Sequence, residues 1–341
     1  MTASQFDAAM SRALELALLG PAYGVNPQVG AVILDPNDEV AAEGYHKGSG
    51  TDHAEVMAIK DLKTKTGRDS FPGYTAVVTL EPCNHTGRTG PCSKALADAG
   101  ISRVVYAVAD PGQESGGGAE FLASRGVEVI KGTGEAAAEE QSRVWLTANR
   151  LERPFVTLKW ASSLDGRTAA TDGSSKWISG EMSRSDSHKR RSEVDAILVG
   201  TGTALADDPE LTARDDQGGY YEHQPLRVVL GERELPGSLR VFNDRAESLH
   251  FKTRDAERAL KELYSRGVKH VWVEGGPAVA SKFVQLGLVD EFIIYLAPML
   301  IGGDKVALQD IGVMSMQGAI ELEIAEQKLL DQDLFIRARR K

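Results

Sequence analysis

Blocks of apolar residues alternate along the chain with polar, glycine-containing turns, and the spacing inside the blocks switches between helical and extended. Apolar residues recur at helical spacing from Phe6 to Leu18, and Ser4 and Asp7 have a spacing like that of a capping box. The continuous apolar run 29–34 ends in the turn-forming sequence Asp-Pro-Asn-Asp. This pattern predicts a helix followed by a buried strand.

The same alternation continues over most of the chain. In the first part it predicts strands at 29–34, 75–80, 104–109 and 127–130, and helices at 54–62, 93–99, 120–124 and 135 to about 149. After Arg153-Pro154 it predicts strands at 155–160, 196–199, 226–230, 270–273, 291–296 and about 334–339, and helices at 182–193, 256–266 and 277–286. Loops are expected at 116–118 and 217–224. Such alternation is typical of an α/β protein whose sheets are covered by helices on both faces.

The length of the chain divides this pattern into two domains. A chain of 341 residues can form two domains with separate cores. The helix from 135 to about 149 is expected to lead from the first domain to the second, so we place the domains at 1–146 and 147–341. The composition, 42% hydrophobic and 26% charged, is that of an ordinary globular protein.

The strongest chemical signal lies in the first domain, which contains both cysteines of the chain. His53-Ala54-Glu55 is followed by Pro82-Cys83 and then by Cys92, an order that is typical of a zinc-dependent deaminase. In that chemistry one histidine and two cysteines hold Zn²⁺, and the fourth position is left to a water molecule whose pKa falls to about 7. The predicted ligands are His53, Cys83 and Cys92, and Glu55 is the predicted catalytic proton carrier.

Two other interpretations of these residues remain open at this point. The cysteines could be free, buried thiols, which is the common state of cysteine in a chain without a disulfide framework. A purely structural zinc site would need a fourth protein ligand, and His85 could supply it. A zinc-binding scaffold without activity would leave Glu55 without a role.

The segment between the cysteines is unusual, because eight residues separate them where most deaminases have two. The sequence Pro82-Cys-Asn-His-Thr-Gly-Arg-Thr-Gly-Pro-Cys92 resembles the pyrimidine deaminase domain of the bifunctional deaminase/reductase family of riboflavin biosynthesis. The resemblance covers nearly the whole chain. It implies a cytidine-deaminase-like α/β/α fold for the first domain and an α/β fold similar to dihydrofolate reductase for the second.

The resemblance also implies which side chains hold the deaminase substrate. Asn26 matches an amide that lines the deaminase pocket, where it can donate and accept hydrogen bonds at once. It could instead be a turn former before Pro27. His46, His85 and Arg88 match family positions that contact the substrate. Asp52 departs from the family, which usually has proline before His-Ala-Glu.

Two glycine-containing turns follow predicted strands in the second domain. They are Val199-Gly-Thr-Gly-Thr203 and Val273-Glu-Gly-Gly-Pro277. In the second turn the glycines allow a close approach to a ligand, and Pro277 suits the first turn of a helix whose free N–H groups can bind a phosphate. Neither turn completes Gly-x-Gly-x-x-Gly, so no Rossmann site is predicted, and the glycines could serve turn geometry alone.

The family resemblance assigns these turns to a reductase that uses NADPH. It rests on Lys159-Trp-Ala-Ser-Ser-Leu-Asp-Gly-Arg-Thr168, Trp177-Ile178 and Leu205-Ala-Asp-Asp-Pro-Glu-Leu-Thr-Ala-Arg214. The positions implied to contact the cofactor are Ala161, Trp177, Thr203, Asp207, Gly276, Pro277, Ala278, Val279, Ala280, Ser281 and Lys282. Those implied to contact the substrate are Ser175, Arg191, Leu211, Arg214 and Glu274. Arginine suits a ribose phosphate because its planar fork binds phosphate in a bidentate fashion.

One departure from the family bears on the choice of cofactor. The family usually has Asp-Ser after the strand at 226–230, where this chain has Gly231-Glu232. A serine hydroxyl can donate a hydrogen bond to a cofactor phosphate, whereas a carboxylate can only accept one and repels the phosphate charge. We therefore expect Glu232 to weaken NADPH binding several-fold relative to a serine, with NADPH still the cofactor.

The zinc motif and the family resemblance together imply that the chain is a bifunctional enzyme of riboflavin biosynthesis that uses Zn²⁺ and NADPH. It is expected to deaminate 2,5-diamino-6-(5-phosphoribosylamino)pyrimidin-4-one and then to reduce the ribosyl group of 5-amino-6-(5-phosphoribosylamino)uracil to ribityl. The alternative is a nucleoside or nucleic-acid deaminase with a non-catalytic second domain. A net charge of −10 disfavours a nucleic-acid partner.

The expected partners are therefore small-molecule phosphoribosylaminopyrimidine substrates and further copies of the chain in a homo-oligomer, without nucleic acid or membrane. The N-terminal residues lack the basic and apolar regions of a signal peptide. No apolar run approaches the roughly 18 residues that a membrane span needs. Two metal-binding cysteines suit a reducing compartment, and we predict a cytoplasmic location.

Overall fold

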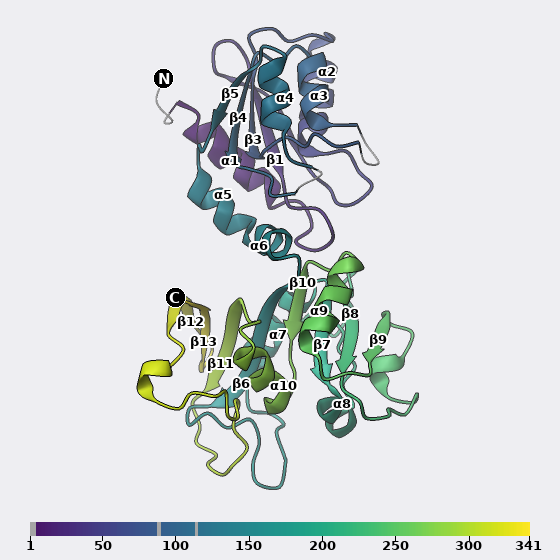
Figure 1. The fold of residues 1–341 in the computed structure, drawn as a ribbon, viewed down its shortest axis with the longest axis vertical. Helices are drawn as coiled ribbons and strands as arrows, with labels where there is room; N and C mark the ends of the chain where they lie inside the picture. Colours follow the sequence, from purple (N-terminus) through teal and green to yellow (C-terminus); the bar gives the residue numbers. More distant parts are fainter. Residues whose placement is uncertain (1–4, 87–89, 113–114) are drawn as a thin grey trace. The chain divides into compact units, whose positions relative to one another are not determined.

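The computed structural model of the protein describes residues 5–86, 90–112 and 115–341. The chain forms two compact units, which we call the first unit (residues 1–152) and the second unit (residues 153–341) (Figure 1). The chain thus divides between residues 152 and 153, a few residues after the boundary expected between 146 and 147. The reason is that the helix Arg143–Leu151 continues through that point, and its Leu146 packs into the core of the first unit.

The first unit is built on a five-stranded mixed sheet. Its strand order is β2-β1-β3-β4-β5, in which β1 is antiparallel to both of its neighbours and β3, β4 and β5 are parallel. The strands are β1 (Gly30–Leu34), β2 (Val40–Tyr45), β3 (Thr75–Leu80), β4 (Arg103–Val108) and β5 (Glu128–Lys131). The helices are α1 (Asp7–Ala17), α2 (Ala54–Thr66), α3 (Cys92–Asp98), α4 (Gly118–Ser124), α5 (Glu135–Gln141) and α6 (Arg143–Leu151).

Helices cover both faces of this sheet, because its central strands are apolar on both sides. On one face, α1, α5 and α6 pack on the strands through residues such as Met10 and Leu146. On the other face, α2, α3 and α4 pack through Leu62, Leu96 and Leu122 (Figure 1). The predicted α/β/α arrangement is confirmed.

The second unit contains an eight-stranded sheet in the order β12-β13-β11-β6-β10-β7-β8-β9. The strands from β11 to β9 run parallel, and β13 and β12 are added antiparallel at one edge. The strands are β6 (Phe155–Ser163), β7 (Ala196–Gly200), β8 (Leu226–Leu230), β9 (Ser248–Phe251), β10 (His270–Val273), β11 (Glu291–Ala297), β12 (Leu322–Leu330) and β13 (Asp333–Arg340). The helices are α7 (Glu181–Arg191), α8 (Thr201–Asp207), α9 (Ala256–Ser265) and α10 (Pro277–Gln285), with short 3-10 turns at Arg240–Phe242 and Met316–Gly318.

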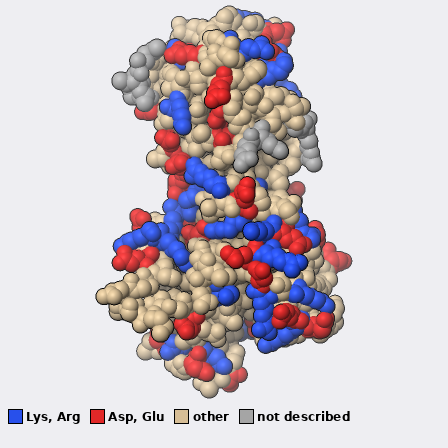
Figure 2. Space-filling model, in the orientation of Figure 1, with Lys and Arg blue, Asp and Glu red and all other residues tan. Residues whose placement is uncertain are grey.

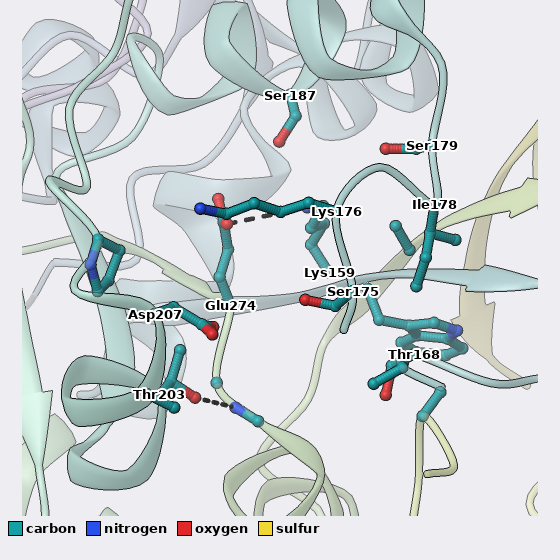
Figure 3. Close-up of a pocket in the computed structure, with 18 of the residues that line it drawn as sticks. Lys159, Thr168, Ser175, Lys176, Ile178, Ser179, Ser187, Thr203, Asp207 and Glu274 are labelled. Atoms are coloured by element: carbon teal, nitrogen blue, oxygen red, sulfur yellow. Dashed lines mark hydrogen bonds and ion pairs between the residues drawn. The ribbon is translucent and has the colours of Figure 1, made fainter. Parts of the chain in front are cut away.

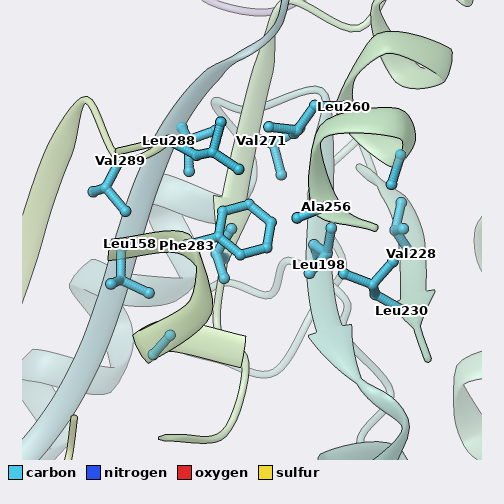
Figure 4. Packing of buried hydrophobic residues seen from close by; sticks show 14 of the residues in the cluster. Leu158, Leu198, Val228, Leu230, Ala256, Leu260, Val271, Phe283, Leu288 and Val289 are labelled. Carbon is cyan, nitrogen blue, oxygen red and sulfur yellow. The ribbon is translucent and has the colours of Figure 1, made fainter. Parts of the chain in front are cut away.

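This sheet also has a hydrophobic core on each of its two faces. On one face α9 and α10 bury Leu260 and Phe283 against Leu158, Leu198 and other strand residues (Figure 4). The opposite core lies under α7 and α8 and contains Trp272, Tyr295 and Phe335. The carboxyl ends of β6, β10 and β7 lie next to one another, which is the usual place for a ligand in such a sheet. No helix among the described residues is long and apolar enough to cross a membrane.

Most expected elements are present, but three features differ from the predictions. The helix expected from 135 to about 149 is two helices, α5 and α6, which break at Ser142 so that Ala138 and Leu146 reach the same core. Strands β2, β9 and β12 and helix α8 were not predicted. Gly118, expected in a loop, begins α4 instead, where a Cβ would lie 1.7 Å from the carbonyl oxygen of Pro82.

We predict that residues 151–341 fold on their own and oxidise NADPH in the presence of the deaminated substrate. The second unit begins with β6 and has its own sheet and two cores, so it loses none of its strands in this fragment. Circular dichroism and NADPH absorbance check the prediction. A matched fragment that begins at residue 161, inside the central strand β6, should fail to fold. Loss of folding in both fragments would contradict an independent second unit.

Candidate active sites

The three predicted zinc ligands come together in the first unit. His53 lies directly before α2, Cys83 follows β3, and Cys92 is the first residue of α3. Nδ1 of His53 is 3.5 Å from Sγ of Cys83 and 3.3 Å from Sγ of Cys92, and the three donor atoms lie within 4.8 Å of one another. Donors of a tetrahedral zinc site with ordinary bond lengths are about 3.5 Å apart. One nitrogen and two sulfurs at this spacing fit zinc with one position open.

The two sulfur atoms interact directly. The backbone N–H of Cys92 donates to Sγ of Cys83 at 3.5 Å. The Cys92 thiol also donates to Cys83, which lowers the pKa of Cys83 and raises the pKa of Cys92. Both cysteines must be thiolates to bind a metal.

Glu55 lies beside this cluster in the first turn of α2 and is 4% exposed. Among the described residues, the group that could hold a metal consists of His53, Cys83 and Cys92, without Glu55. Burial, together with the negative charge of the Cys83 thiolate, raises the pKa of Glu55 to about 7. A carboxyl group that titrates near neutrality can both take up and release a proton, as a general acid–base catalyst must.

Asn26 and His46 form a pair next to the cluster. The Asn26 amide nitrogen lies 2.9 Å from Nε2 of His46, and Nδ1 of His46 lies 3.1 Å from the carbonyl oxygen of Asp52. That carbonyl can only accept, so Nδ1 carries the proton and Nε2 accepts from the amide. His46 is buried, its ring packs edge-on against that of His53 with 5.2 Å between centroids, and both ring nitrogens are engaged. It therefore orients Asn26 and His53 in this arrangement.

The segment between the cysteines contains two further candidates. His85 is half-buried and does not belong to the His-Cys-Cys group, so the described geometry offers three protein ligands for zinc. Its Nδ1 atom is buried without a hydrogen-bond partner among the described residues. Arg88 lies outside the described residues, and its role stays a prediction.

Glu81 is a structural residue of this site that the sequence did not single out. It is buried, and its carboxylate accepts from the backbone N–H groups of Asp110 at 3.2 Å and Ala119 at 3.0 Å. These bonds attach the residue Asp110 after β4 and the first turn of α4 to the segment that carries Cys83. A glutamate directly before Pro-Cys, at the end of an apolar strand, was the available signal.

The second unit contains a cleft of about 880 Å³ at the carboxyl ends of β6, β7 and β10 (Figure 3). Its volume is in the range of small-molecule and cofactor sites. Among the residues implied by the family resemblance, those that line it are Ala161, Ser175, Trp177, Arg191, Thr203, Asp207, Leu211, Arg214, Glu274, Gly276, Pro277, Ala278 and Val279.

Three residues of the implied cofactor stretch do not line the cleft. Ala280 and Ser281 are buried, and Lys282 is exposed outside the cleft. The Ser281 hydroxyl accepts from the backbone N–H of Gln309 at 2.7 Å. The part of this stretch that lines the cleft therefore ends with Val279, in the first turn of α10.

The two glycine turns, which the sequence shows as separate signals, belong to one site. The N–H of Gly276 donates to Oγ1 of Thr203 at 3.0 Å, which links the turn after β10 to α8 (Figure 3). Val279 packs between the two turns, because a Cβ at Gly200 or at Gly275 would lie 2.7 Å from its side chain. Glycine is needed at both positions for this close approach.

A buried network of charges forms the floor of the cleft. Glu274 accepts from Nε and Nη2 of Arg191 at 2.6 and 2.7 Å and from the indole N–H of Trp272 at 2.6 Å, and Nζ of Lys159 lies 3.8 Å away. The side chains of Lys159, Arg191 and Glu274 are 18%, 14% and 11% exposed. Burial opposes ionisation of Glu274, but the charges of Arg191 and Lys159 hold its pKa well below the usual range.

Lys159 is a cleft residue to which the sequence assigned no role. Burial lowers its pKa, although Glu274 opposes this effect. The available signal was a single charged residue inside the apolar strand Phe-Val-Thr-Leu-Lys-Trp. An ammonium group in a cleft with a lowered pKa is a candidate proton donor.

We predict that Glu274→Gln lowers the free energy of unfolding of the second unit by about 3 kcal/mol. The substitution leaves Arg191 and Lys159 without a counter-charge, and breaking a buried ion pair in this way costs roughly 3–5 kcal/mol. Urea unfolding measures the change. The matched control is Glu262→Gln, which breaks the exposed pair between Glu262 on α9 and Arg266 just after that helix and should cost less than about 1 kcal/mol. Similar losses in the two variants would contradict the prediction.

Glu232, which the sequence placed near the cofactor phosphate, is not among the residues that line the cleft. Its carboxylate pairs with Arg254 at 3.1 Å, and the two side chains are 59% and 80% exposed. The guanidinium therefore offsets much of the negative charge that was expected to repel NADPH.

The first unit thus has the donor set and proton carrier of a zinc-dependent deaminase, and the second has a nucleotide-sized cleft with a buried charge network. These features define a two-site enzyme. Residues 3–108 match the cytidine and deoxycytidylate deaminase zinc-binding region, and residues 154–336 match the RibD C-terminal domain.

Riboflavin biosynthesis proteins of other organisms match nearly the whole chain. The riboflavin biosynthesis protein RibD of Mycobacterium tuberculosis is 43% identical over 333 residues, which cover 97% of this chain and 96% of the relative. The Escherichia coli protein is 34% identical over 362 residues, covering 96% and 97%. The structure of Acinetobacter baumannii RibD has a TM-score of 0.90 at 34% identity and covers 100% of both chains. That of the Thermotoga maritima diaminohydroxyphosphoribosylaminopyrimidine deaminase/5-amino-6-(5-phosphoribosylamino)uracil reductase has a TM-score of 0.84 at 33% identity and covers 99% of both.

The chain belongs to the RibD family of riboflavin-biosynthesis proteins. It is a bifunctional enzyme with a zinc-dependent deaminase domain and an NADPH-dependent reductase domain. The predicted fold, the two activities and the two cofactors are confirmed.

Proposed function

We propose that the first unit deaminates 2,5-diamino-6-(5-phosphoribosylamino)pyrimidin-4-one and that the second reduces the product, 5-amino-6-(5-phosphoribosylamino)uracil, at its ribosyl group. The observation that carries the proposal is the His53–Cys83–Cys92 group with buried Glu55 beside it, in a chain whose second unit has the reductase cleft. The name of the Thermotoga maritima relative supports these substrates.

In the deamination, water adds to the ring carbon that bears the 2-amino group, and ammonia leaves. Bound zinc supplies this water in an activated form. Glu55 takes one proton from the attacking water and delivers it to the adjacent ring nitrogen, where it stays. It then takes the second proton from the added hydroxyl group, as the carbonyl forms, and delivers it to the departing amine. Asn26, whose amide is oriented by His46, is placed to hydrogen-bond the substrate.

In the reduction, the bond between C1′ and the ring oxygen of the ribose opens and C1′ gains a hydride. Bound NADPH supplies that hydride. The ring oxygen needs a proton as it leaves C1′, and the Lys159 ammonium, held in the cleft by Glu274, is the donor that the geometry favours. Arg214 also lines the cleft and is a cation for the substrate phosphate.

The test uses the purified protein with the diaminopyrimidinone substrate and follows ammonia and NADPH separately. Ammonia should appear with or without NADPH, because deamination needs no hydride. NADPH should be consumed only after ammonia has formed, or at once when the deaminated uracil is supplied directly. Deamination of free cytidine at a similar rate, or no consumption of NADPH with the uracil substrate, would contradict the proposal.

We further propose that the protein works as a homo-oligomer in the cytoplasm and binds small molecules rather than nucleic acid. Large apolar side chains are exposed in the second unit, among them Leu300 at 76%, Met314 at 94%, Met316 at 87% and Leu329 at 70%, and burial of such side chains would favour subunit contacts. Acidic and basic side chains are interspersed on the face in view (Figure 2). Light scattering of the purified protein tests the oligomer, and titration with single-stranded DNA and RNA tests the preference for small molecules.

Glu232→Ser is expected to change the KM for NADPH by at most about fivefold. An exposed ion pair is worth about 0–1 kcal/mol, and Arg254 already offsets the carboxylate charge. Arg254→Ser, which leaves Glu232 unpaired, should weaken the binding of NADPH more than that of NADH. The KM values for both nucleotides in the two variants check this, and equal changes for NADPH and NADH in Arg254→Ser would show that the pair lies away from the bound phosphate.

A further inference from the structure

His188 on α7 lines the reductase cleft and has no part in the proposed reactions. Its Nδ1 atom lies 3.1 Å from the carbonyl oxygen of Thr212, and its Nε2 atom lies 3.5 Å from Nη2 of Arg214. The imidazole therefore bridges the backbone of one cleft segment and the guanidinium two residues further along it.

The partners of His188 determine its protonation state. The Thr212 carbonyl can only accept, so Nδ1 carries the proton, and the guanidinium can only donate, so Nε2 accepts. The imidazole is then neutral. Burial, together with the positive charges of Arg191 and Arg214, lowers the pKa of His188 to about 4, against the smaller opposing effect of Glu274.

The same contacts hold the backbone of the segment 211–214. The Thr212 carbonyl also accepts from Nη1 of Arg191 at 3.0 Å. His188 and Arg191 lie about one helical turn apart on α7. Leu211, the residue before Thr212, has a φ of 54°, which is unfavourable for a side chain of its type. Two donors from one helix thus fix a turn that the isolated chain would avoid.

The two arginines of the cleft differ in the charge that they leave for a ligand. Arg191 is paired with Glu274 through two hydrogen bonds. Within the described part of the chain no carboxylate forms an ion pair with Arg214; the Glu210 carboxylate, which also lines the cleft, interacts with it electrostatically without such a contact. The hydrogen-bond partner of Arg214 is the neutral His188. A neutral acceptor orients a guanidinium and leaves its charge available, whereas a carboxylate would cancel that charge.

We propose that His188 is a positioning residue that holds the Arg214 guanidinium for the phosphate group of the reductase substrate. The inference rests on the proposed function, which supplies a ribose phosphate as the ligand. Because a pre-oriented group binds without the cost of ordering it, loss of His188 should act on binding of the phosphate and leave hydride transfer almost unchanged.

The experiment compares four variants of the full chain, His188→Leu, His188→Gln, Arg214→Gln and the double variant His188→Leu/Arg214→Gln. Lys189→Gln is the matched control, since Lys189 is the exposed neighbour of His188 on α7 and does not line the cleft. KM and kcat are measured for the uracil substrate with saturating NADPH. Calorimetric titration with ribose 5-phosphate, with ribose and with NADPH measures binding without turnover, and thermal unfolding checks that each variant folds.

His188→Leu should raise the KM for the uracil substrate about tenfold, equivalent to about 1.4 kcal/mol, with kcat within about twofold of wild type. Binding of ribose 5-phosphate should weaken by a similar factor, while binding of ribose and of NADPH should be unchanged. In the Arg214→Gln background, His188→Leu should have almost no further effect, because the group that it positions is already gone. His188→Gln, which keeps a donor and an acceptor, should recover part of the loss.

Independent effects of the two substitutions, or equal weakening of ribose 5-phosphate and ribose, would overturn the inference. Weaker binding of NADPH by His188→Leu would also overturn the inference, because Arg214 would then bind the cofactor phosphate. Should His188→Leu fail to fold, the same comparisons in His188→Gln decide the question. A wild-type protein that binds ribose 5-phosphate through His188 and Arg214 but cannot reduce the uracil substrate would count against the proposed function and not against this inference.

Discussion

Glu55→Gln is expected to lower kcat for deamination by about 10²–10⁴-fold while zinc content and folding stay unchanged. This range is typical of general acid–base catalysis by a single side chain. Glu55 is buried beside the His-Cys-Cys group without belonging to it, so the amide removes the proton carrier and no ligand. The amide keeps nearly the same shape and places no charge in the buried site.

The measurements for this variant are ammonia release and metal content. The matched control is Glu120→Gln, since Glu120 also lies in the first turn of a helix of the first unit, α4, but is exposed. It should deaminate at the wild-type rate, and both variants should still reduce the uracil substrate with NADPH. Near-normal deamination by zinc-loaded Glu55→Gln would remove Glu55 from the mechanism.

Cys83→Ser and Cys92→Ser are each expected to abolish deamination through loss of zinc. A thiolate is a far better zinc ligand than a serine hydroxyl, which stays protonated near neutral pH. The group has one donor atom from each of three residues, and these atoms lie within 4.8 Å of one another. Loss of either sulfur therefore leaves only two of the three protein ligands. Reduction of the uracil substrate should continue, because the reductase cleft lies in the second unit.

Metal analysis of the two cysteine variants is the decisive measurement. We expect clearly less than one zinc per chain in both, under conditions in which the wild-type protein and Glu55→Gln are fully loaded. The rate of NADPH consumption with the uracil substrate serves as the internal control for folding. One zinc per chain in both variants would mean that the ligand set is wrong.

The deaminase site could be predicted from the sequence because its signals are local. His53 and Glu55 lie at the start of one helix, and Pro82-Cys83 directly follows a strand, so short spacings fix how these residues face the site. The role of His46 could not be predicted in the same way. It depends on Asn26, which comes from another loop, and on the Asp52 carbonyl, and these two partners leave no ring nitrogen free.

The reductase site was harder to predict from the sequence, because its residues come from strands and helices far apart in the chain. The sequence indicated each glycine turn, but only packing against Val279 shows that the two turns form one site. The stretch from Gly276 to Lys282 looks continuous in sequence, yet only Gly276 to Val279, at the start of α10, line the cleft. Lys159 interacts with Glu274, and His188 interacts with Arg214. No rule of sequence spacing predicts either pair.

By itself, the sequence determined the alternation of strands and helices, the presence of two units and the zinc donor set, because periodicity and short motifs depend on neighbouring residues. Tertiary structure alone decided which strands pair. Residues Leu322–Leu330 have the composition of a helix, with leucine, glutamate, alanine and lysine, but form the edge strand β12 because β13 supplies its hydrogen-bond partners. Tertiary structure also decided which charged side chains lie together at the floor of the cleft, since Lys159, Arg191 and Glu274 come from β6, α7 and the end of β10. Contacts between such distant segments follow from the strand order of the sheet, which no local pattern encodes.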